Sequence, residues 1–185
     1  MKGLLVAAVV VLAVVVVVLG VSMLTYNGLV RRRDQVEDAW GQVDVQLRRR
    51  SDLVPTLVEM INGYAAHEWA TVEVVTEARA RALRAHGPAE QGPAESALTG
   101  ALKSLFAVVE SYPDLRASTG FLELQGELAV TEDRAAYARQ YYNDTVLTYN
   151  NAIATVPQRI FAAVFRFRAG EYFQPGGEER GPVPV

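Results

Sequence analysis

The sequence predicts an all-α protein, in which an N-terminal transmembrane helix is followed by an antiparallel up-down bundle of long helices, three long and one shorter. Two observations lead to this prediction. An uncharged apolar run fills the N-terminal region, and from Tyr26 to Val156 apolar residues recur with a helical period while no run alternates as in a strand. The prolines lie at the boundaries between the periodic segments, where they separate helices.

The apolar run, Leu4–Leu24, reads LLVAAVVVLAVVVVVLGVSML. As a helix it reaches about 30 Å, which matches the hydrocarbon thickness of a bilayer. A cleaved signal peptide is the alternative, with Gly20-Val21-Ser22 as a weak cleavage site. Signal peptides have a shorter apolar region of about 7–15 residues. We therefore expect an uncleaved anchor that contacts the lipid bilayer.

Positively charged residues near the ends of this run set the expected orientation. Lys2 lies on the N-terminal side, whereas Arg31, Arg32 and Arg33 follow on the C-terminal side. Lys and Arg accumulate on the cytoplasmic side of membrane helices. We expect a single pass through the cell membrane, with the N-terminus outside and the bundle in the cytoplasm.

The predicted domains are the anchor (1–25), the helical bundle (26–173) and a disordered Pro/Gly-rich tail (174–185). Within the bundle we expect a break or kink at Ser51–Pro55, because Pro disfavours helix at the residue before it, and a loop over 87–93. The predicted helices span residues 26–50, 55–86, 94–111 and 116–155, of which 94–111 is the shortest. Apolar heptads such as Val54, Ile61, Val75 and Ala82 predict that these helices pack against one another.

Charged residues interrupt the apolar rows of these helices. They form a candidate buried polar layer of Arg50, Glu68, Arg79, Glu132 and Arg139. Because a buried charge must be paired, we interpret them as an inter-helix ion-pair layer that sets the register of the helices. Glu132 and Arg139 are two turns apart, so each is expected to pair across helices. The alternative is a perturbed carboxylate in a pocket.

A Tyr-Asn dipeptide occurs three times. These candidate helix-contact motifs are Tyr26-Asn27, Tyr142-Asn143 and Tyr149-Asn150. We expect the Tyr rings to pack inside while the Asn side chains form hydrogen bonds between helices. The alternative is that they line a binding groove.

The segment after Pro157 combines aromatic and basic residues. Its candidate membrane-surface residues are Arg159, Phe161, Phe165, Arg166, Phe167 and Arg168. If the helices alternate in direction, this segment returns to the level of Tyr26, where aromatic rings and guanidinium groups suit a lipid interface. The alternative is a short helix that caps the open end of the bundle.

Composition excludes several classes of function. The net charge of −3 argues against a general nucleic-acid surface, and the absence of Cys excludes disulfides, thiolate zinc sites and a Cys nucleophile. His67-Glu68 lacks the second His of a zinc motif. We predict no catalytic, cofactor or metal site and no small-molecule substrate.

Two stretches together resemble the LemA family of bacterial membrane proteins. The first covers residues 26–58, with YNGLV, AW and DVQLRRRSDLVPTLV; the second includes ESYPDL at 110–115, FLELQ at 121–125 and the Tyr-Asn pairs at 142 and 149. The resemblance covers residues 1–173 and implies an anchored antiparallel helical bundle without established catalytic activity. It also implies kinship with proteins that organise bacterial membrane compartments. Val156-Pro157 and the 117–120 linker depart from the usual family pattern.

The first functional hypothesis is a non-enzymatic scaffold or adaptor at the bacterial cell membrane, with a protein partner or self-association. The second is a dedicated binding module for a membrane protease or a transport complex. The third is an enzyme that uses the carboxylates of the candidate polar layer.

Overall fold

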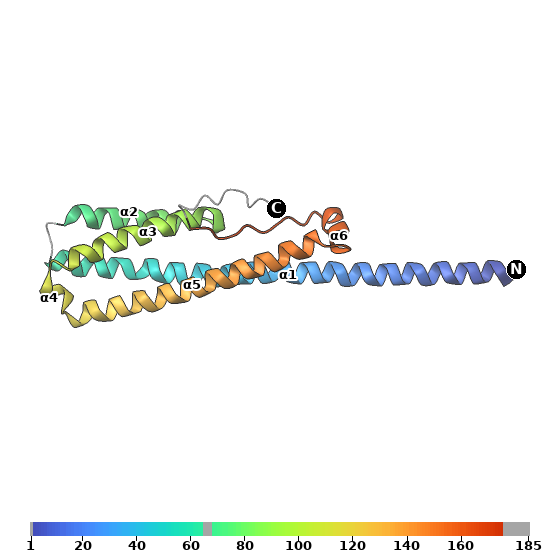
Figure 1. Ribbon diagram of the computed structural model, residues 1–185, viewed down its shortest axis with the longest axis horizontal. Coiled ribbons are helices and arrows are strands. Elements are labelled where there is room, and N and C mark those ends of the chain that lie inside the picture. The colour runs from blue at the N-terminus through green and yellow to red at the C-terminus, as the bar shows by residue number, and fades with distance from the viewer. Residues whose placement is uncertain (1, 65–67, 176–185) are drawn as a thin grey trace. The chain divides into compact units, whose positions relative to one another are not determined.

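The computed structural model describes residues 2–64 and 68–175. This part of the chain is helical and contains no strand, which confirms the predicted fold class. Its helices are α1 (Lys2–Tyr64), α2 (Trp69–Arg84), α3 (Gly87–Val109), α4 (Pro113–Arg116), α5 (Thr119–Ala154) and α6 (Gln158–Val164), as labelled in Figure 1.

The chain divides into two compact units. The first unit comprises Met1–Asp38 and Asp144–Gly170, and the second comprises Ala39–Asn143 and Glu171–Val185. The first unit therefore holds the N-terminal part of α1, the end of α5 and α6. The second holds the rest of α1, then α2, α3, α4 and most of α5. The boundary predicted at residue 25 falls inside the first unit.

The second unit is an up-down bundle. The C-terminal part of α1 and then α2, α3 and α5 run in alternating directions (Figure 1). Each helix contributes to one apolar core, whose buried members include Val54, Leu57, Ile61, Val75, Ala82, Leu98, Leu105, Phe121 and Leu128. Each fully buried Leu, Ile, Val or Phe side chain stabilises the fold by about 1.5–3 kcal/mol. The predicted row from Val54 to Ala82 is buried as expected.

The helix does not break at Ser51–Pro55, because α1 continues through it to Tyr64. Pro55 has no N–H for the carbonyl of Ser51, and Ser51 is buried. Instead, Nε of Arg79 in α2 donates a hydrogen bond to that carbonyl at 2.7 Å. A neighbouring helix thus supplies the donor that the proline lacks, and α1 passes through without a break.

Two further boundaries differ from the prediction. The predicted helix 55–86 is divided between α1 and α2, so that α2, with 16 residues, is shorter than α3, with 23. The predicted loop 87–93 is helical, because Pro88 lies in the first turn of α3, where no N–H is needed. The Glu90 carboxylate also accepts a hydrogen bond from the backbone N–H of His86 at 3.0 Å.

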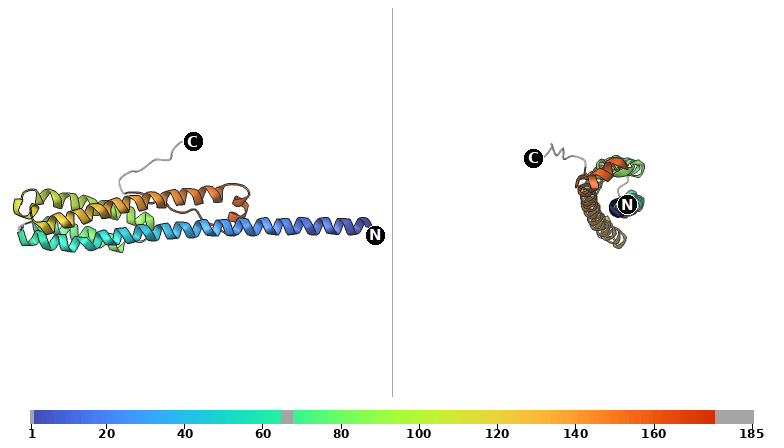
Figure 2. Two further views of the ribbon diagram at one scale, coloured as in Figure 1. Left: turned by 90° about the horizontal axis from the view of Figure 1, so that it is seen from below. Right: turned by 90° about the vertical axis from the view of Figure 1, so that its right-hand side faces the viewer.

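The first unit contains the apolar run that was predicted to be a membrane anchor. No residue of the most apolar window of α1 is buried, and the helix is long and apolar enough to cross a membrane. The side chains from Val9 to Leu19 are largely exposed, as expected for a helix surrounded by lipid. α6 follows α5 and lies beside α1 in both views (Figures 1 and 2). Of the predicted tail, the structure describes Gln174 and Pro175; residues 176–185 lie outside the described residues.

Candidate functional site

Four charged residues meet inside the second unit, and we call them the charged layer: Arg50, Glu95, Glu132 and Arg139. Nη1 of Arg50 lies 3.1 Å from Oε2 of Glu95 and 3.2 Å from Oε2 of Glu132. The contact with Glu132 is an ion pair without hydrogen-bond alignment. Nη2 of Arg139 donates to Oε1 of Glu132 at 3.0 Å. The layer therefore alternates in sign along its length and joins α1, α3 and α5.

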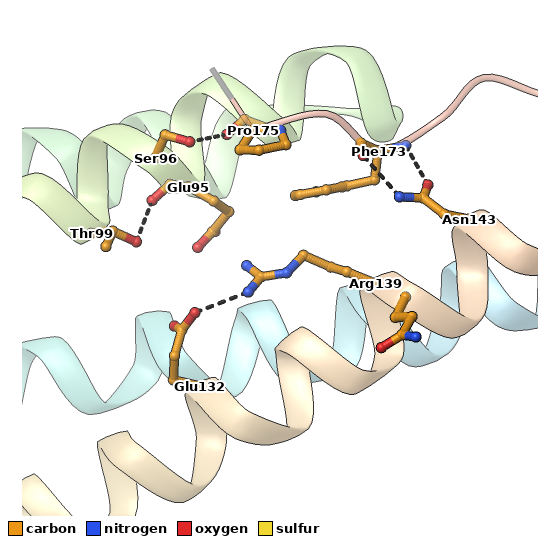
Figure 3. Close-up of a pocket in the computed structure, with 10 residues that line it drawn as sticks. Glu95, Ser96, Thr99, Glu132, Arg139, Asn143, Phe173 and Pro175 are labelled. Atoms are coloured by element: carbon orange, nitrogen blue, oxygen red, sulfur yellow. Dashed lines mark hydrogen bonds and ion pairs between the residues drawn. The ribbon is translucent and has the colours of Figure 1, made fainter. Parts of the chain in front are cut away.

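Glu132 pairs across helices with Arg50, as expected, but it also pairs directly with Arg139, which the distance of two turns had argued against. Two helical turns separate their backbones by about 10.5 Å, and the two long side chains span this distance by extending toward each other along α5. Figure 3 shows the two side chains pointing toward one another. Glu132 thus forms ion pairs with two guanidinium groups, that of Arg139 on its own helix and that of Arg50 on α1.

Glu95 is the member that the sequence analysis missed. Its side chain is 2% exposed and that of Arg50 is 5% exposed. Arg50 also donates to Oγ1 of Thr99 at 2.8 Å, and Gln91 donates to Oε1 of Glu95 at 3.2 Å. The signal was present, since Gln91, Glu95 and Leu98 continue the core face of α3 by one turn toward its N-terminus. The predicted helix 94–111 includes Glu95, but the predicted loop over 87–93 removed the preceding turn with Gln91, so the core face was not extended to Glu95.

Burial raises the pKa of Glu95 above its ordinary value, and the nearby Arg50 guanidinium opposes this shift. Removal of a carboxylate from water disfavours its charged form, whereas the ion pair and the hydrogen bonds favour it. The ion pairs of Arg50 connect α1 to α3 and to α5.

Glu68 and Arg79 lie away from the charged layer. Glu68 is the residue before α2, and its carboxylate accepts a hydrogen bond from the Tyr112 hydroxyl at 3.2 Å. Arg79 donates to the Ser51 carbonyl described above. The structure therefore brings together three of the five predicted polar residues and gives the other two separate contacts. His67 lies outside the described residues.

A pocket of about 380 Å³ adjoins the charged layer. Figure 3 shows that it lies between α3, α5 and the extended residues 171–175. Phe173 of that segment is buried, with the Arg139 guanidinium 5.7 Å from its ring centre. Both carboxylates of the pocket, Glu95 and Glu132, face guanidinium groups. The pocket therefore presents balanced charge instead of a free acid or base.

The hydrogen-bonding groups of the second and third Tyr-Asn motifs bind an extended backbone instead of another helix, while the Tyr142 ring packs 5.3 Å from the Trp40 ring of α1. In the second unit, the Tyr142 hydroxyl donates to the carbonyl of Glu171 at 2.6 Å. Asn143 both donates to the carbonyl of Phe173 at 3.1 Å and accepts from its N–H at 2.9 Å. The expectation of an Asn bond between helices is wrong for this motif, because its amide meets main-chain groups of the returning segment.

The same pattern recurs in the first unit. The Tyr149 hydroxyl donates to the carbonyl of Arg168 at 2.9 Å, and Asn150 exchanges two hydrogen bonds with Gly170 at 2.8 and 3.0 Å. Seven residues of helix rise by about 10.5 Å, and three residues of extended chain span about 10 Å. The two motifs are seven residues apart on α5, and their partners in the extended segment are three residues apart, so the two spacings match. We call these two motifs the backbone clamp.

The tyrosines of the clamp remain hydrogen-bond donors at neutral pH. Burial, with a smaller contribution from the Glu171 carboxylate, raises the pKa of Tyr142 to about 12. Burial also raises the pKa of Tyr149, although Arg33 opposes the shift. Both rings are buried as predicted.

The first Tyr-Asn motif differs from the other two. The Tyr26 ring lies 4.9 Å from the ring of Phe165 and 5.9 Å from that of Phe167, while Asn27 is exposed. The segment after Pro157 thus reaches the level of Tyr26, as the count of helix directions predicted. Among the predicted membrane-surface residues, Arg159, Phe165, Arg166 and Arg168 are exposed, and Phe161 and Phe167 are half-buried.

The fold and the site define a class of protein: a helical bundle with an apolar N-terminal helix suited to a membrane, an internal charged layer and a clamped C-terminal segment. Comparison with protein families agrees with this class. The LemA family model matches residues 39–185, and the chain belongs to the LemA family.

Several proteins are similar to the chain along most of its length. Magnetosome protein MamQ 2 of Paramagnetospirillum magneticum is 27% identical over 195 residues, which cover 89% of this chain and 71% of the relative. Magnetosome protein MamQ of Magnetospirillum gryphiswaldense is 28% identical over 184 residues, or 84% and 68% of the two chains. Protein LemA of Metamycoplasma hominis is 26% identical over 133 residues, or 70% and 59%.

Proposed function

We propose that the chain is a non-enzymatic scaffold or adaptor that α1 anchors in the cell membrane by a single pass. The observation that supports this proposal most directly is that α1 is helical without interruption from Lys2 to Tyr64. One helix supplies both the exposed apolar stretch and a wall of the bundle core. A continuous helix of this kind suits a protein that holds partners close to the bilayer.

The polar side chains inside the second unit support a structural role. The charged layer is internally paired, and the clamp uses its hydrogen-bonding groups on the main chain of the same protein. A perturbed carboxylate does occur at Glu95, but it faces Arg50 at 3.1 Å and is almost fully buried. This arrangement favours the structural interpretation over an enzyme that uses these carboxylates.

We propose that the N-terminus lies outside and the bundle in the cytoplasm, on the basis of Arg31, Arg32 and Arg33 after the apolar run. The chain has no Cys, so single cysteines report topology without background. Gly3 and Gly41 both have open space where a Cβ would lie, which makes Gly3→Cys and Gly41→Cys matched variants. A membrane-impermeant maleimide applied to intact cells should label Gly3→Cys and spare Gly41→Cys until the cells are permeabilised. The reverse pattern would invert the orientation.

The scaffold role is tested by photo-crosslinking in cells. On α5, Leu122, Val130 and Tyr137 lie within about 80° of one another at 100° per residue, and all three are exposed, Tyr137 at 75%. This stripe is the surface that we propose meets a partner. A photoreactive residue at Tyr137 should capture several proteins or a second copy of the chain, and one at exposed Glu59 on α1 should capture neither.

The same exposed stripe favours the second candidate function, a dedicated binding module for a membrane protease or a transport complex. In that case the crosslinks at Tyr137 would converge on one stoichiometric partner. Equal crosslinking at Tyr137 and Glu59 would remove the basis for both proposals, because the stripe would then carry no selectivity.

A further inference from the structure

A second hollow, in the first unit, is almost entirely apolar. Its volume is about 630 Å³, and it is lined by four residues of α1 between Leu19 and Tyr26 and by four of α6 and its end between Ile160 and Phe165. This volume falls within the range of about 300–1,000 Å³ that is typical of ligand sites. The Ser22 hydroxyl donates to the carbonyl of Val18 at 2.7 Å, so it presents no unsatisfied donor to the groove.

The walls of this groove carry apolar side chains that face outward. Met23 on α1 is 71% exposed, and Val164 on α6 is 67% exposed. Ile160 and Phe165 are also exposed. A helix as short as α6 is not expected to hold so many exposed apolar groups in water without a partner. The groove continues the apolar surface of the anchor, because Leu19 and Met23 belong to both.

Aromatic and basic residues border the groove at the end of the anchor. The ring of Tyr26 contacts Phe165 and Phe167, and the Arg33 guanidinium lies 6.0 Å from the Phe167 ring centre. The turn after α6 produces this contact: Arg166 adopts a left-handed φ of 58°, and the N–H of Phe167 bonds to the carbonyl of Ala162 at 2.9 Å.

Exposed positive charge also lies near the groove, on α1 after the apolar run and in and after α6. These exposed arginines include Arg31, Arg32, Arg159, Arg166 and Arg168. Aromatic rings and guanidinium groups suit the headgroup level of a bilayer, where the rings are partly solvated and the charges meet phosphate. Along α1 the lining of the groove is apolar from Leu19 to Met23 and the arginines begin at Arg31, an order that matches the acyl chain and the headgroup of a phospholipid.

We propose that the groove between α1 and α6 binds one acyl chain of a bilayer phospholipid, whose phosphate meets the surrounding arginines. Two observations select this occupant: the groove is continuous with the exposed surface of the anchor, and its cationic border complements a phosphate. The proposal rests on the membrane anchoring proposed above. It assigns α6 to the lipid interface, so that the leaflet covers the exposed side chains of Ile160, Val164 and Phe165.

The test uses full-length protein reconstituted in liposomes that contain phosphatidylglycerol with a photoreactive diazirine in its acyl chain. After irradiation, peptide mass spectrometry maps the labelled residues. Labelling of the anchor between Val9 and Val18 reports insertion itself, and labelling of Ile160 to Phe165 reports the groove. Two tryptophan variants are matched: Val164→Trp fills the groove, and Ala163→Trp places the same side chain at an exposed neighbour that does not line it.

We expect both regions to be labelled in the parent protein. Val164→Trp should lower labelling of α6 by about tenfold, the effect of displacing roughly two methylene groups, and Ala163→Trp should leave it unchanged. A labelled anchor with an unlabelled α6 would overturn the lipid site and leave the anchor intact. Equal labelling of α6 in both variants would show general surface contact and also overturn the groove. An unlabelled anchor would refute membrane insertion, and the site with it.

Discussion

The hydrogen bond from Arg79 to the Ser51 carbonyl gives the sharpest test of how α1 passes through Pro55. Arg79→Met removes the donor and keeps most of the aliphatic side chain. The buried carbonyl is then unsatisfied, because Pro55 offers no N–H, and we expect a loss of about 1–3 kcal/mol in the free energy of unfolding. For a protein of this size that loss corresponds to a fall of roughly 2–12 °C in melting temperature, at about 2–4 °C per kcal/mol.

The decisive comparison is the same substitution in a Pro55→Ala background. The alanine introduced there supplies the missing N–H to Ser51, so the carbonyl no longer depends on Arg79. We expect Arg79→Met to cost clearly less in this background, with a coupling energy of about 1–2 kcal/mol between the two sites. The assay is thermal and urea unfolding of the full-length protein in mild detergent, followed by circular dichroism. An equal cost in both backgrounds would show that Arg79 acts through some contact other than this bond.

Three further predictions concern the charged layer and the clamped segment. Arg50→Met should destabilise the second unit by about 3–5 kcal/mol in urea unfolding, because it leaves the buried Glu95 unpaired; a loss under about 1 kcal/mol would contradict the pairing. Burial raises the pKa of the Glu95 carboxyl above 4.5 in the folded protein, so the folded state binds the proton of this carboxyl more tightly than the unfolded state does. The stabilisation that this proton gives is present at acid pH and is lost as the pH rises from 4.5 toward the raised pKa. Glu95→Gln should therefore flatten the pH dependence of the melting temperature in that window, and an unchanged slope would refute the shift. Gly92→Ala should expel residues 171–175, since a Cβ there would overlap the Gln174 carbonyl, and limited proteolysis should then cut this segment faster; Gly100→Ala, which meets open space, is the control.

Much of the candidate site was accessible from the sequence because charge inside an apolar row is a strong signal. Arg50, Glu132 and Arg139 stand on heptad rows, and the structure brings them together. Glu95 lies in the predicted helix 94–111 but was not assigned to its core face, because two prolines within seven residues suggested a loop up to residue 93 in place of the first turns of α3. Proline is compatible with the first turn of a helix, and only the observed position of that turn shows where the core face begins.

The Tyr-Asn motifs illustrate a different limit. Their spacing of seven residues predicted one face of α5 correctly, and both rings are buried there. The same face can meet a helix or an extended strand, since the two alternatives use the same donors and acceptors. The partner was decided by the path of residues 165–175, which no local pattern in this segment specifies.

The sequence by itself determined the helical class, the apolar N-terminal helix and the apolar rows of the core, because these depend on local periodicity and on the cost of burying polar groups. The tertiary structure alone decided where helices end. From the sequence, Pro55 predicts a break, yet the guanidinium of Arg79, 28 residues after Ser51, satisfies the Ser51 carbonyl that the proline leaves free. Contacts between residues distant in the chain can overcome a local preference of a few kcal/mol, and the sequence does not show which of them form.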